Sequence, residues 1–398
     1  PLISQNPMEN AQKNLKILMM VRNFDFGGAE NHVCTLANEL SCRGNEVWII
    51  SGGGRQIQQL HNGIHHLTKK FCDHFLIFQV LWLIRLVYRE KFDVIHAHQR
   101  IMILAANLAA FFTKTPVIAT VHGRIRYDLR SKFVRKFSAG IIAICENSLV
   151  GMQRDPFLAH KSVHIPNGIR FKEIAESTAK GEIRFSYISR IDQRHFEIIR
   201  FLIQEVWPSV IEKYPNARLV VAGDGPFLSQ LQKLVHLSDN QLISNSIHIE
   251  GYVNVLDQIL TTTNLVFGVG RVALEAIAAG VPVFSIKNKR MGEIICCNKL
   301  QHFQFGNFVD LDGHEPDAVV ICRKISEFIE NEQFYRSQSR QIRKHIESVY
   351  HIETVAASTE LLYESMINAY LMDKINHEKV LLPTGDLMPD YVNFLSKH

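Results

Sequence analysis

The chain has 398 residues, of which 46% are hydrophobic and 21% are charged, and its formal net charge is +5. This length exceeds the roughly 250–300 residues at which a single core usually stops growing, so we expect two domains, and the composition excludes a disordered or fibrous protein. The charge is too small to indicate a nucleic-acid partner, but it suits anionic substrates or a neighbouring anionic membrane.

Short, apolar, β-branched runs alternate along the chain with segments of helical length. This alternation is typical of the βαβ units that build a parallel sheet buried on both faces. In the first half, the expected strands are Leu15–Val21, Val47–Ile50, Val94–His96, Val117–Val121 and Ile141–Ile144.

Two motifs of the first half follow predicted strands, at the edge where such sheets bind ligands. Gly27 and Gly28 lie between a strand and a helical segment, so their backbone could approach a diphosphate, although a simple tight turn is an equal alternative. His122 follows the strand Val117–Val121 directly and should project into a cleft, with a structural role as its alternative. His96 could equally be a hydrogen-bonded core residue.

The most apolar stretch of the sequence runs from Phe75 to Tyr88. It contains Gln79 and Arg85 and is shorter than the ~20 residues that cross a bilayer, so we do not expect a transmembrane helix. We interpret it as a well-buried amphipathic helix that leads into the strand at Val94, rather than as a membrane contact.

The same alternation starts again after the turn-forming sequence Ile165-Pro166-Asn167-Gly168. The expected strands of the second half are Phe185–Ile188, Leu219–Ala222, Ile247–Ile249, Leu265–Phe267 and Val283–Ser285. We therefore predict an α/β fold with two Rossmann-like, doubly wound parallel-sheet domains, at residues 1–167 and 168–351.

Cations follow the first strand of the second half. Arg190 and Arg194 could pair with phosphate oxygens, with His195 beside them, although ordinary surface salt bridges are an equal alternative. The next strand ends in the tight turn Gly223-Asp224-Gly225-Pro226, to which we assign a mainly structural role.

The segment from Phe267 to Ala276 carries the strongest signal of the second half, because it combines a strand, a Gly-x-Gly turn and a helix. Its candidate donor-binding residues are Gly268, Gly270, Arg271, Val272 and Glu275. The exposed amides of Gly270 and the next two residues would face a phosphate or a sugar, while Glu275 could accept from ribose hydroxyls. The third glycine of a dinucleotide fingerprint is missing, which argues against a dehydrogenase.

The seven cysteines are odd in number and scattered, with the spacing of neither a disulfide scaffold nor a zinc site. We expect reduced thiols and hence a cytoplasmic protein. The polar start of the sequence, Pro1 to Asn14, lacks the basic-then-apolar order of a secretory signal, in agreement with that expectation.

Together these motifs resemble retaining glycosyltransferases of the GT-B fold, specifically the large family 4 that builds bacterial surface glycans. The resemblance covers roughly Leu15 to Leu371. It rests, in chain order, on Gly27-Gly28-Ala29-Glu30, His122-Gly123, Ile165-Pro166-Asn167-Gly168, Arg190, Gly223-Asp224-Gly225-Pro226, Gly251-Tyr252 and Leu274-Glu275-Ala276 with Gly280-Val281-Pro282-Val283.

The resemblance implies a metal-independent enzyme without a cofactor, which moves a sugar from a nucleotide diphosphate donor to a glycan or lipid-linked acceptor. UDP-sugars are favoured over GDP-sugars. Gly27 and Gly28 would approach the donor, His122 would contact the transferred sugar, Arg190 would neutralise the leaving diphosphate, and Glu275 would hold the ribose. The last helix, at residues 352–371, would cross back to the first domain, which the tail at 372–398 would also join.

Two departures from the family pattern leave alternatives open. Phe267 stands where the family has a second glutamate, eight positions before Glu275. The usual lysine five residues after Arg190 is replaced by His195, for which Arg194 could substitute. The rival interpretations are a catalytically silent sugar-nucleotide-binding homologue or subunit, and a GT-B nucleotide-sugar epimerase.

A basic segment follows His122 and interleaves its cations with apolar and aromatic side chains. The cations are Arg124, Arg126, Arg130, Lys132, Arg135 and Lys136. Our hypothesis is that they bind an anionic membrane surface and bring a membrane-held acceptor to the donor, while the alternative is a solvated helix face.

Overall fold

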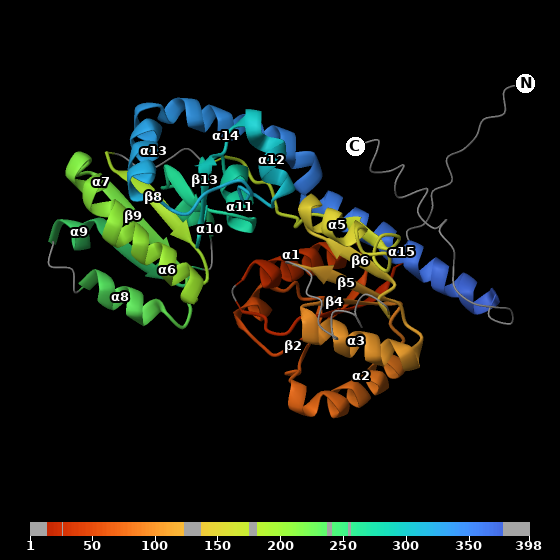
Figure 1. Ribbon diagram of the computed structural model, residues 1–398. Helices are drawn as coiled ribbons and strands as arrows, with labels where there is room; N and C mark the ends of the chain where they lie inside the picture. The colour runs from red at the N-terminus through yellow and green to blue at the C-terminus, as the bar shows by residue number, and fades with distance from the viewer. Residues whose placement is uncertain are drawn as a thin grey trace, which may run out of the picture.

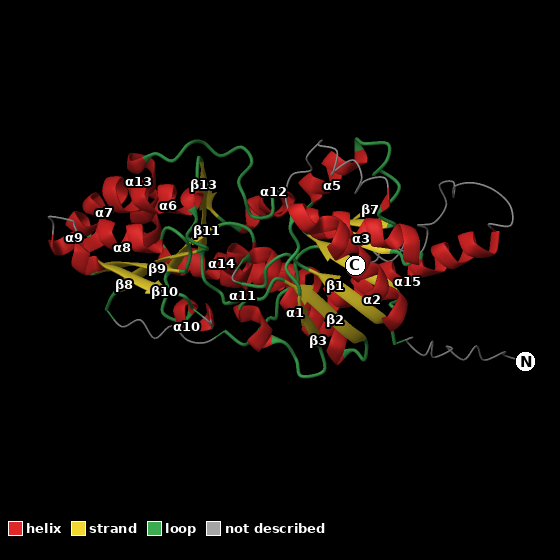
Figure 2. Ribbon diagram, turned by 90° about the horizontal axis from the view of Figure 1, so that it is seen from below, coloured by secondary structure: helices red, strands yellow, loops and turns green. Residues whose placement is uncertain are grey.

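The structure is a computed structural model that describes residues 14–25, 27–122, 137–174, 181–236, 241–253 and 256–376. These residues form two α/β domains, in each of which helices cover a mainly parallel sheet (Figures 1 and 2). The predicted fold of two Rossmann-like domains is therefore confirmed. The basic segment from Arg124 to Lys136 and the tail after Asn376 lie outside the described residues.

The first domain contains a sheet of seven parallel strands in the order β3-β2-β1-β4-β5-β6-β7. The strands are β1 (Lys16–Met20), β2 (Glu46–Ser51), β3 (His65–Thr68), β4 (Val94–His98), β5 (Val117–Val121), β6 (Gly140–Ala143) and β7 (Ser162–His164). The order changes direction between β1 and β4, which is the place where doubly wound sheets bind ligands, beyond the carboxyl ends of the strands.

Helices cover both faces of the first sheet because its strands are apolar on both sides. Ile17 and Met19 of β1 pack on one face, and Leu18 and Met20 pack on the other. The first face holds α1 (Gly28–Cys42) and α15 (Ile352–Asn376), and the second holds α2 (Leu76–Glu90) and α3 (Arg100–Thr113). The shorter elements of this domain are η1 (Arg55–Gln59), η2 (Asp73–Phe75) and α5 (Glu146–Gln153).

The C-terminal helix α15 returns to the first domain, as the family resemblance implied. It follows the last helix of the second domain, and its Val355, Leu362 and Tyr363 are buried in the core cluster that contains β1 and α1. In Figure 1 its far end projects beyond the first sheet.

The second domain contains a six-stranded sheet in the order β10-β9-β8-β11-β12-β13, with only the edge strand β13 antiparallel among the described strands. The strands are β8 (Ile183–Ile188), β9 (Ala217–Ala222), β10 (Ile247–Gly251), β11 (Leu265–Gly268), β12 (Val283–Lys287) and β13 (Arg290–Ile294). The helical elements are α6 (Gln193–Phe201), η3 (Leu202–Val206), α7 (Trp207–Lys213), α8 (Leu228–His236), α9 (Gln241–Ser246), α10 (Leu256–Leu260), α11 (Arg271–Ala278), η4 (Cys297–Lys299), α12 (Leu300–Phe305), α13 (Ala318–Glu330) and α14 (Glu332–Tyr350).

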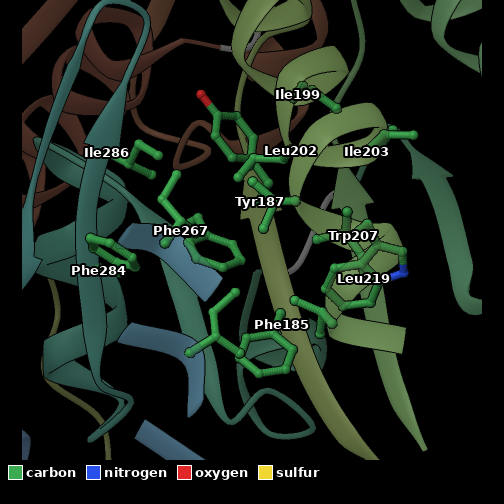
Figure 3. Close-up of a cluster of buried hydrophobic side chains, with 14 of the residues drawn as sticks. Phe185, Tyr187, Ile199, Leu202, Ile203, Trp207, Leu219, Phe267, Phe284 and Ile286 are labelled. Carbon is green, nitrogen blue, oxygen red and sulfur yellow. The ribbon is translucent and has the colours of Figure 1, made fainter. Parts of the chain in front are cut away.

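Aromatic side chains fill the core on one face of the second sheet (Figure 3). The ring centroids of Phe185 and Phe267 are 5.9 Å apart, and those of Phe267 and Phe284 are 5.8 Å apart. Trp207 meets Phe185 edge-on, and its indole Nε1 donates to Ser246 Oγ at 2.7 Å. Offset and edge-on ring packing of this kind adds to the stabilisation that burial gives.

The helix α2 corrects the prediction of a well-buried helix for the most apolar stretch of the sequence. Its inner face is buried against the sheet through Val80, Leu83 and Val87, but its outer face leaves Phe78 and Leu81 exposed. Among the described residues, none of the helices combines the length and the apolar character needed to cross a membrane.

Candidate functional site

A cleft of about 970 Å³ lies between the two domains, at the carboxyl ends of both sets of strands. The first domain lines it with Gly27, Gly28 and His122, together with polar side chains of α1 and η1. The second domain lines it with the loops that follow β8, β10 and β11. Ligand pockets typically measure about 300–1,000 Å³, so the cleft can hold a nucleotide sugar.

The glycine pair opens α1 at the wall of the cleft. The N-cap residue Gly27 has extended backbone, and a Cβ atom there would lie 2.3 Å from Oε2 of Glu30. No side chain caps this helix end, so its first N–H groups remain suited to a diphosphate. Burial raises the pKa of Glu30, whose carboxylate accepts from Gln99 Nε2 at 2.8 Å, while the charge of Arg190 opposes that shift.

His122 belongs to a cluster of histidine side chains at the end of the first sheet. Its Nε2 lies 3.1 Å from Nδ1 of His98, and the ring of His32 meets both of these rings edge-on. Burial lowers the pKa of His122 to about 4, so its imidazole is neutral near pH 7 and can exchange hydrogen bonds with a sugar hydroxyl.

His96 is the hydrogen-bonded core residue that the sequence left as one alternative. Its Nδ1 lies 2.6 Å from the hydroxyl of Tyr363 in α15, and its Nε2 lies 2.7 Å from Oγ1 of Thr120. The side chain is fully buried, and burial lowers the pKa of His96 to about 3. It therefore connects the returning helix to the strands that carry the site.

The loop after β8 places Arg190 and His195 at the cleft but turns Arg194 away from it. Asp192 caps α6 by accepting from the amides of Arg194 and His195, which fixes the start of the helix. The side chain of Arg194 is exposed outside the cleft, which argues against its replacing the missing lysine. His195 Nδ1 lies 2.9 Å from the hydroxyl of Tyr187, and burial lowers the pKa of His195.

The Gly-x-Gly turn leads from β11 into α11, and Gly268 and Val272 line the cleft. Gly270 has a φ of 62°, the left-handed conformation that favours glycine. Its amide donates to the carbonyl of Asn307 at 3.0 Å and so already has a partner within the protein. The free N–H groups of the turn therefore begin at Arg271, the first residue of the helix.

Arg271 and Glu275 form an ion pair inside the cleft, with Nε 2.7 Å from Oε1. The other guanidinium nitrogens donate to the carbonyl of Gly168 and to Oγ1 of Thr35, both at 3.1 Å. Thr35 belongs to α1, so Arg271 links the linker and both domains with a side chain that is only 9% exposed. A ribose would share the carboxylate of Glu275 with this arginine.

Phe267 occupies the position where the family has a glutamate near the donor, eight residues before Glu275, but its side chain does not face the cleft. It lies inside β11, pairs with Tyr187 of β8 and is 1% exposed in the aromatic core (Figure 3). Only Val269 and Gly270 separate β11 from α11, and neither carries an acidic side chain.

Arg55 of η1 makes a contact across the cleft that the sequence did not reveal. Its guanidinium pairs with the carboxylate of Asp224 and lies 4.4 Å from the ring centroid of Tyr252. This hydrogen bond lowers the pKa of Asp224. The glycines around Asp224 keep the structural role expected of them, since a Cβ atom on Gly223 would lie 1.7 Å from the carbonyl oxygen of Ser189.

We expect Arg55→Ala to open the cleft, because domains joined at a short linker rock as rigid bodies when a bridging contact is lost. Small-angle scattering of the variant without ligand should give a larger radius of gyration than the wild type, and saturating UDP-glucose should reduce the difference. Arg184→Ala is the control, since it removes an ion pair within the second domain. Identical profiles for all samples would contradict this account.

Comparisons with known proteins identify the family. The model described as Glycosyltransferase Family 4 matches residues 26–173, and that of Glycosyl transferases group 1 matches residues 182–302. The gpi3 subunit of phosphatidylinositol N-acetylglucosaminyltransferase from Schizosaccharomyces pombe is 22% identical over 390 residues, covering 89% of this chain and 83% of that protein. An Escherichia coli UDP-Gal:alpha-D-GlcNAc-diphosphoundecaprenol alpha-1,3-galactosyltransferase is 22% identical over 263 residues, covering 56% of this chain and 67% of that protein.

Among solved structures, Anabaena HepE in complex with UDP-glucose aligns with a TM-score of 0.69 at 15% identity, covering 89% of this chain and all of that one. The fold is therefore shared although the sequences have diverged. With one family model on each domain, and both domains facing one cleft, the chain belongs to glycosyltransferase family 4 (group 1), the retaining glycosyltransferases of the GT-B fold.

Proposed function

We propose that this protein transfers a hexose or a related sugar from a UDP-sugar to a lipid-linked or oligosaccharide acceptor, with retention of the anomeric configuration. The observation that carries the proposal is the cleft, in which the start of α1 and His122 face Arg190 and Glu275. HepE, which shares the fold, is solved with UDP-glucose. The Escherichia coli relative is named for a UDP-sugar donor and a lipid-linked acceptor, which supports both halves of the proposal.

In this proposal the diphosphate lies between the first turn of α1 and the guanidinium of Arg190. Negative charge develops on the leaving diphosphate as its bond to the anomeric carbon breaks. The acceptor hydroxyl bonds to that carbon and gives its proton to the diphosphate. Fixed N–H groups and a cation stabilise this charge without having to reorganise. His122 hydrogen bonds to the transferred sugar as a neutral imidazole, and Glu275 accepts from the ribose.

The cytoplasm is the proposed compartment, and a cell-surface polysaccharide or lipopolysaccharide is the proposed product. All seven cysteines are free thiols, as a reducing compartment requires. The nucleotide sugar and the growing glycan or lipid-linked acceptor are then the partners of the cleft.

A catalytically silent sugar-nucleotide-binding homologue is the second candidate. Two observations favour it: Arg271 already occupies one carboxylate oxygen of Glu275, and His195 supplies no positive charge where the family has lysine. Such a protein would bind the donor without consuming it.

A thermal-shift screen followed by a transfer assay tests the proposal. We expect UDP-sugars to raise the melting temperature more than GDP- or ADP-sugars, because a ligand that binds only the folded state stabilises it by mass action. We also expect the shift and the turnover to persist in excess EDTA. If none of the nucleotide sugars raises the melting temperature, the proposal fails; binding without turnover over a panel of glycan and polyprenyl-diphosphate acceptors would favour the silent homologue.

A further inference from the structure

The outer face of α2 exposes large apolar side chains that no described element covers. Phe78 and Leu81 lie three residues apart and Tyr88 lies two turns further along the same face, so they form a stripe. Phe75 and Ile77 extend the stripe at the start of the helix. The inner face packs on the sheet through Val80, Leu83, Leu86 and Val87, so burial of α2 does not require the outer side chains to be apolar.

The end of α3 widens this stripe into a surface. Tyr88 donates its hydroxyl proton to the carbonyl of Phe112 at 2.6 Å, which joins the two helices, and the rings of Phe111 and Phe112 meet edge-on at 5.3 Å. We define the α2–α3 surface as Phe75, Ile77, Phe78, Leu81, Tyr88, Phe111 and Phe112, each of which is between 56% and 76% exposed. Figure 1 shows the two helices side by side on one face of the first domain.

Cations lie within and beside the α2–α3 surface. Arg85 lies within the stripe itself, and Lys114 holds its Nζ 5.4 Å from the ring centroid of Phe111. Residues 69–91 contain five lysines and arginines but only two acids, and one of the acids, Glu90, pairs with Lys16 and Arg89. The apolar stripe is therefore bordered by net positive charge.

We propose that the α2–α3 surface docks on an anionic phospholipid bilayer. Aromatic and aliphatic side chains enter the boundary between headgroups and acyl chains, while lysine and arginine extend toward lipid phosphates. The lysines favour this occupant, because protein interfaces are depleted in lysine, whereas an anionic bilayer complements Lys114 and the three lysines of residues 69–91. Docking is a property of this surface alone and rests on the proposed function only for its purpose, which is to bring the cleft to a lipid-linked acceptor.

Flotation with vesicles tests the proposal. At low salt, the wild-type protein should float with vesicles of equal parts phosphatidylglycerol and phosphatidylcholine, and should stay at the bottom with phosphatidylcholine alone or at high salt. Ile77→Ser combined with Phe78→Ser should reduce the floated fraction at least tenfold, and Arg85→Gln combined with Arg89→Gln should reduce it several-fold.

The matched control is Val319→Ser combined with Phe334→Ser, which removes a β-branched side chain and a phenylalanine, both exposed, from the second domain and should float like the wild type. The melting temperature and the UDP-glucose affinity of each variant establish that fold and cleft are intact, so loss of flotation with retained donor binding supports docking independently of the transfer reaction. The proposal is overturned if the wild type ignores anionic vesicles, or if the Ile77 and Phe78 variant floats unchanged. It is equally overturned if the wild type is a dimer that the Ile77 and Phe78 variant dissociates without losing flotation, because the surface would then bind a second copy of the chain. Flotation that depends only on the cations from Arg124 to Lys136 would also overturn it.

Discussion

Replacing Arg190 or Glu275 with alanine is expected to weaken the binding of a UDP-sugar by about 10- to 150-fold, because each change removes a charge-assisted hydrogen bond worth roughly 1.5–3 kcal/mol. Arg190 faces the cleft from the loop after β8, and Glu275 faces it from α11. The two side chains would hold different parts of the donor, the diphosphate and the ribose. Titration calorimetry with UDP-glucose measures both effects directly.

The controls follow from the geometry of the two sites. Arg194→Ala removes a cation four residues from Arg190 that lies outside the cleft, so donor affinity should stay at the wild-type value. Arg271→Ala should free the carboxylate of Glu275. Tighter donor binding would mean that Arg271 competes with the donor for this carboxylate, and weaker binding would mean that Arg271 itself contacts the donor. Unchanged affinity in both the Arg190 and Glu275 variants would rule out this placement of the donor.

The buried part of the fold was predictable from the sequence because its strands carry a strong local pattern. All ten predicted strands are present; nine of them are inner strands of their sheets, and the tenth, β10, is an edge strand. The strands β3, β7 and β13 were missed. Each of them is an edge strand of its sheet. The sequence of β3 is His-His-Leu-Thr, which shows neither an apolar run nor a regular alternation of apolar and polar residues.

The candidate site was predictable where a residue lies in the loop, or in the first turns of the helix, that follows a parallel strand. Gly27, His122, Arg190 and Glu275 all reach the cleft, because the carboxyl ends of parallel strands meet at one edge. The contacts between Arg55 and Asp224 and between Arg271 and Thr35 depend on how the domains face each other, which no local pattern encodes. The exposure of the outer face of α2 was not predicted, because a helix with apolar residues on both faces is usually buried within its own protein.

Acidification is expected to destabilise the folded protein strongly, because histidines are buried without charge beside the cleft. The pKa of His96 falls from 6.5 to about 3 on burial, and burial also lowers the pKa values of His32 and His98 well below that ordinary value. Between the two pKa values of each group, the unfolded chain binds a proton that the folded chain does not. Their contribution is therefore fully present above about pH 6.5 and is lost as the pH falls toward the folded-state values.

The expected loss of unfolding free energy in acid is large enough to measure. His96 alone should remove about 2 kcal/mol of unfolding free energy between about pH 7 and about pH 5, out of a typical total of roughly 5–15 kcal/mol. Urea unfolding at several pH values measures how steeply the unfolding free energy changes with pH.

Since carboxylates also titrate in acid, the decisive comparison is His32→Phe, which removes a buried ring whose Nδ1 has no hydrogen-bond partner among the described residues. This variant should lower the slope by about one proton, or roughly 1.4 kcal/mol per pH unit, whereas His160→Gln at the surface should leave it unchanged. Equal slopes for the wild type and His32→Phe would mean that protonation of this buried histidine does not control stability in acid.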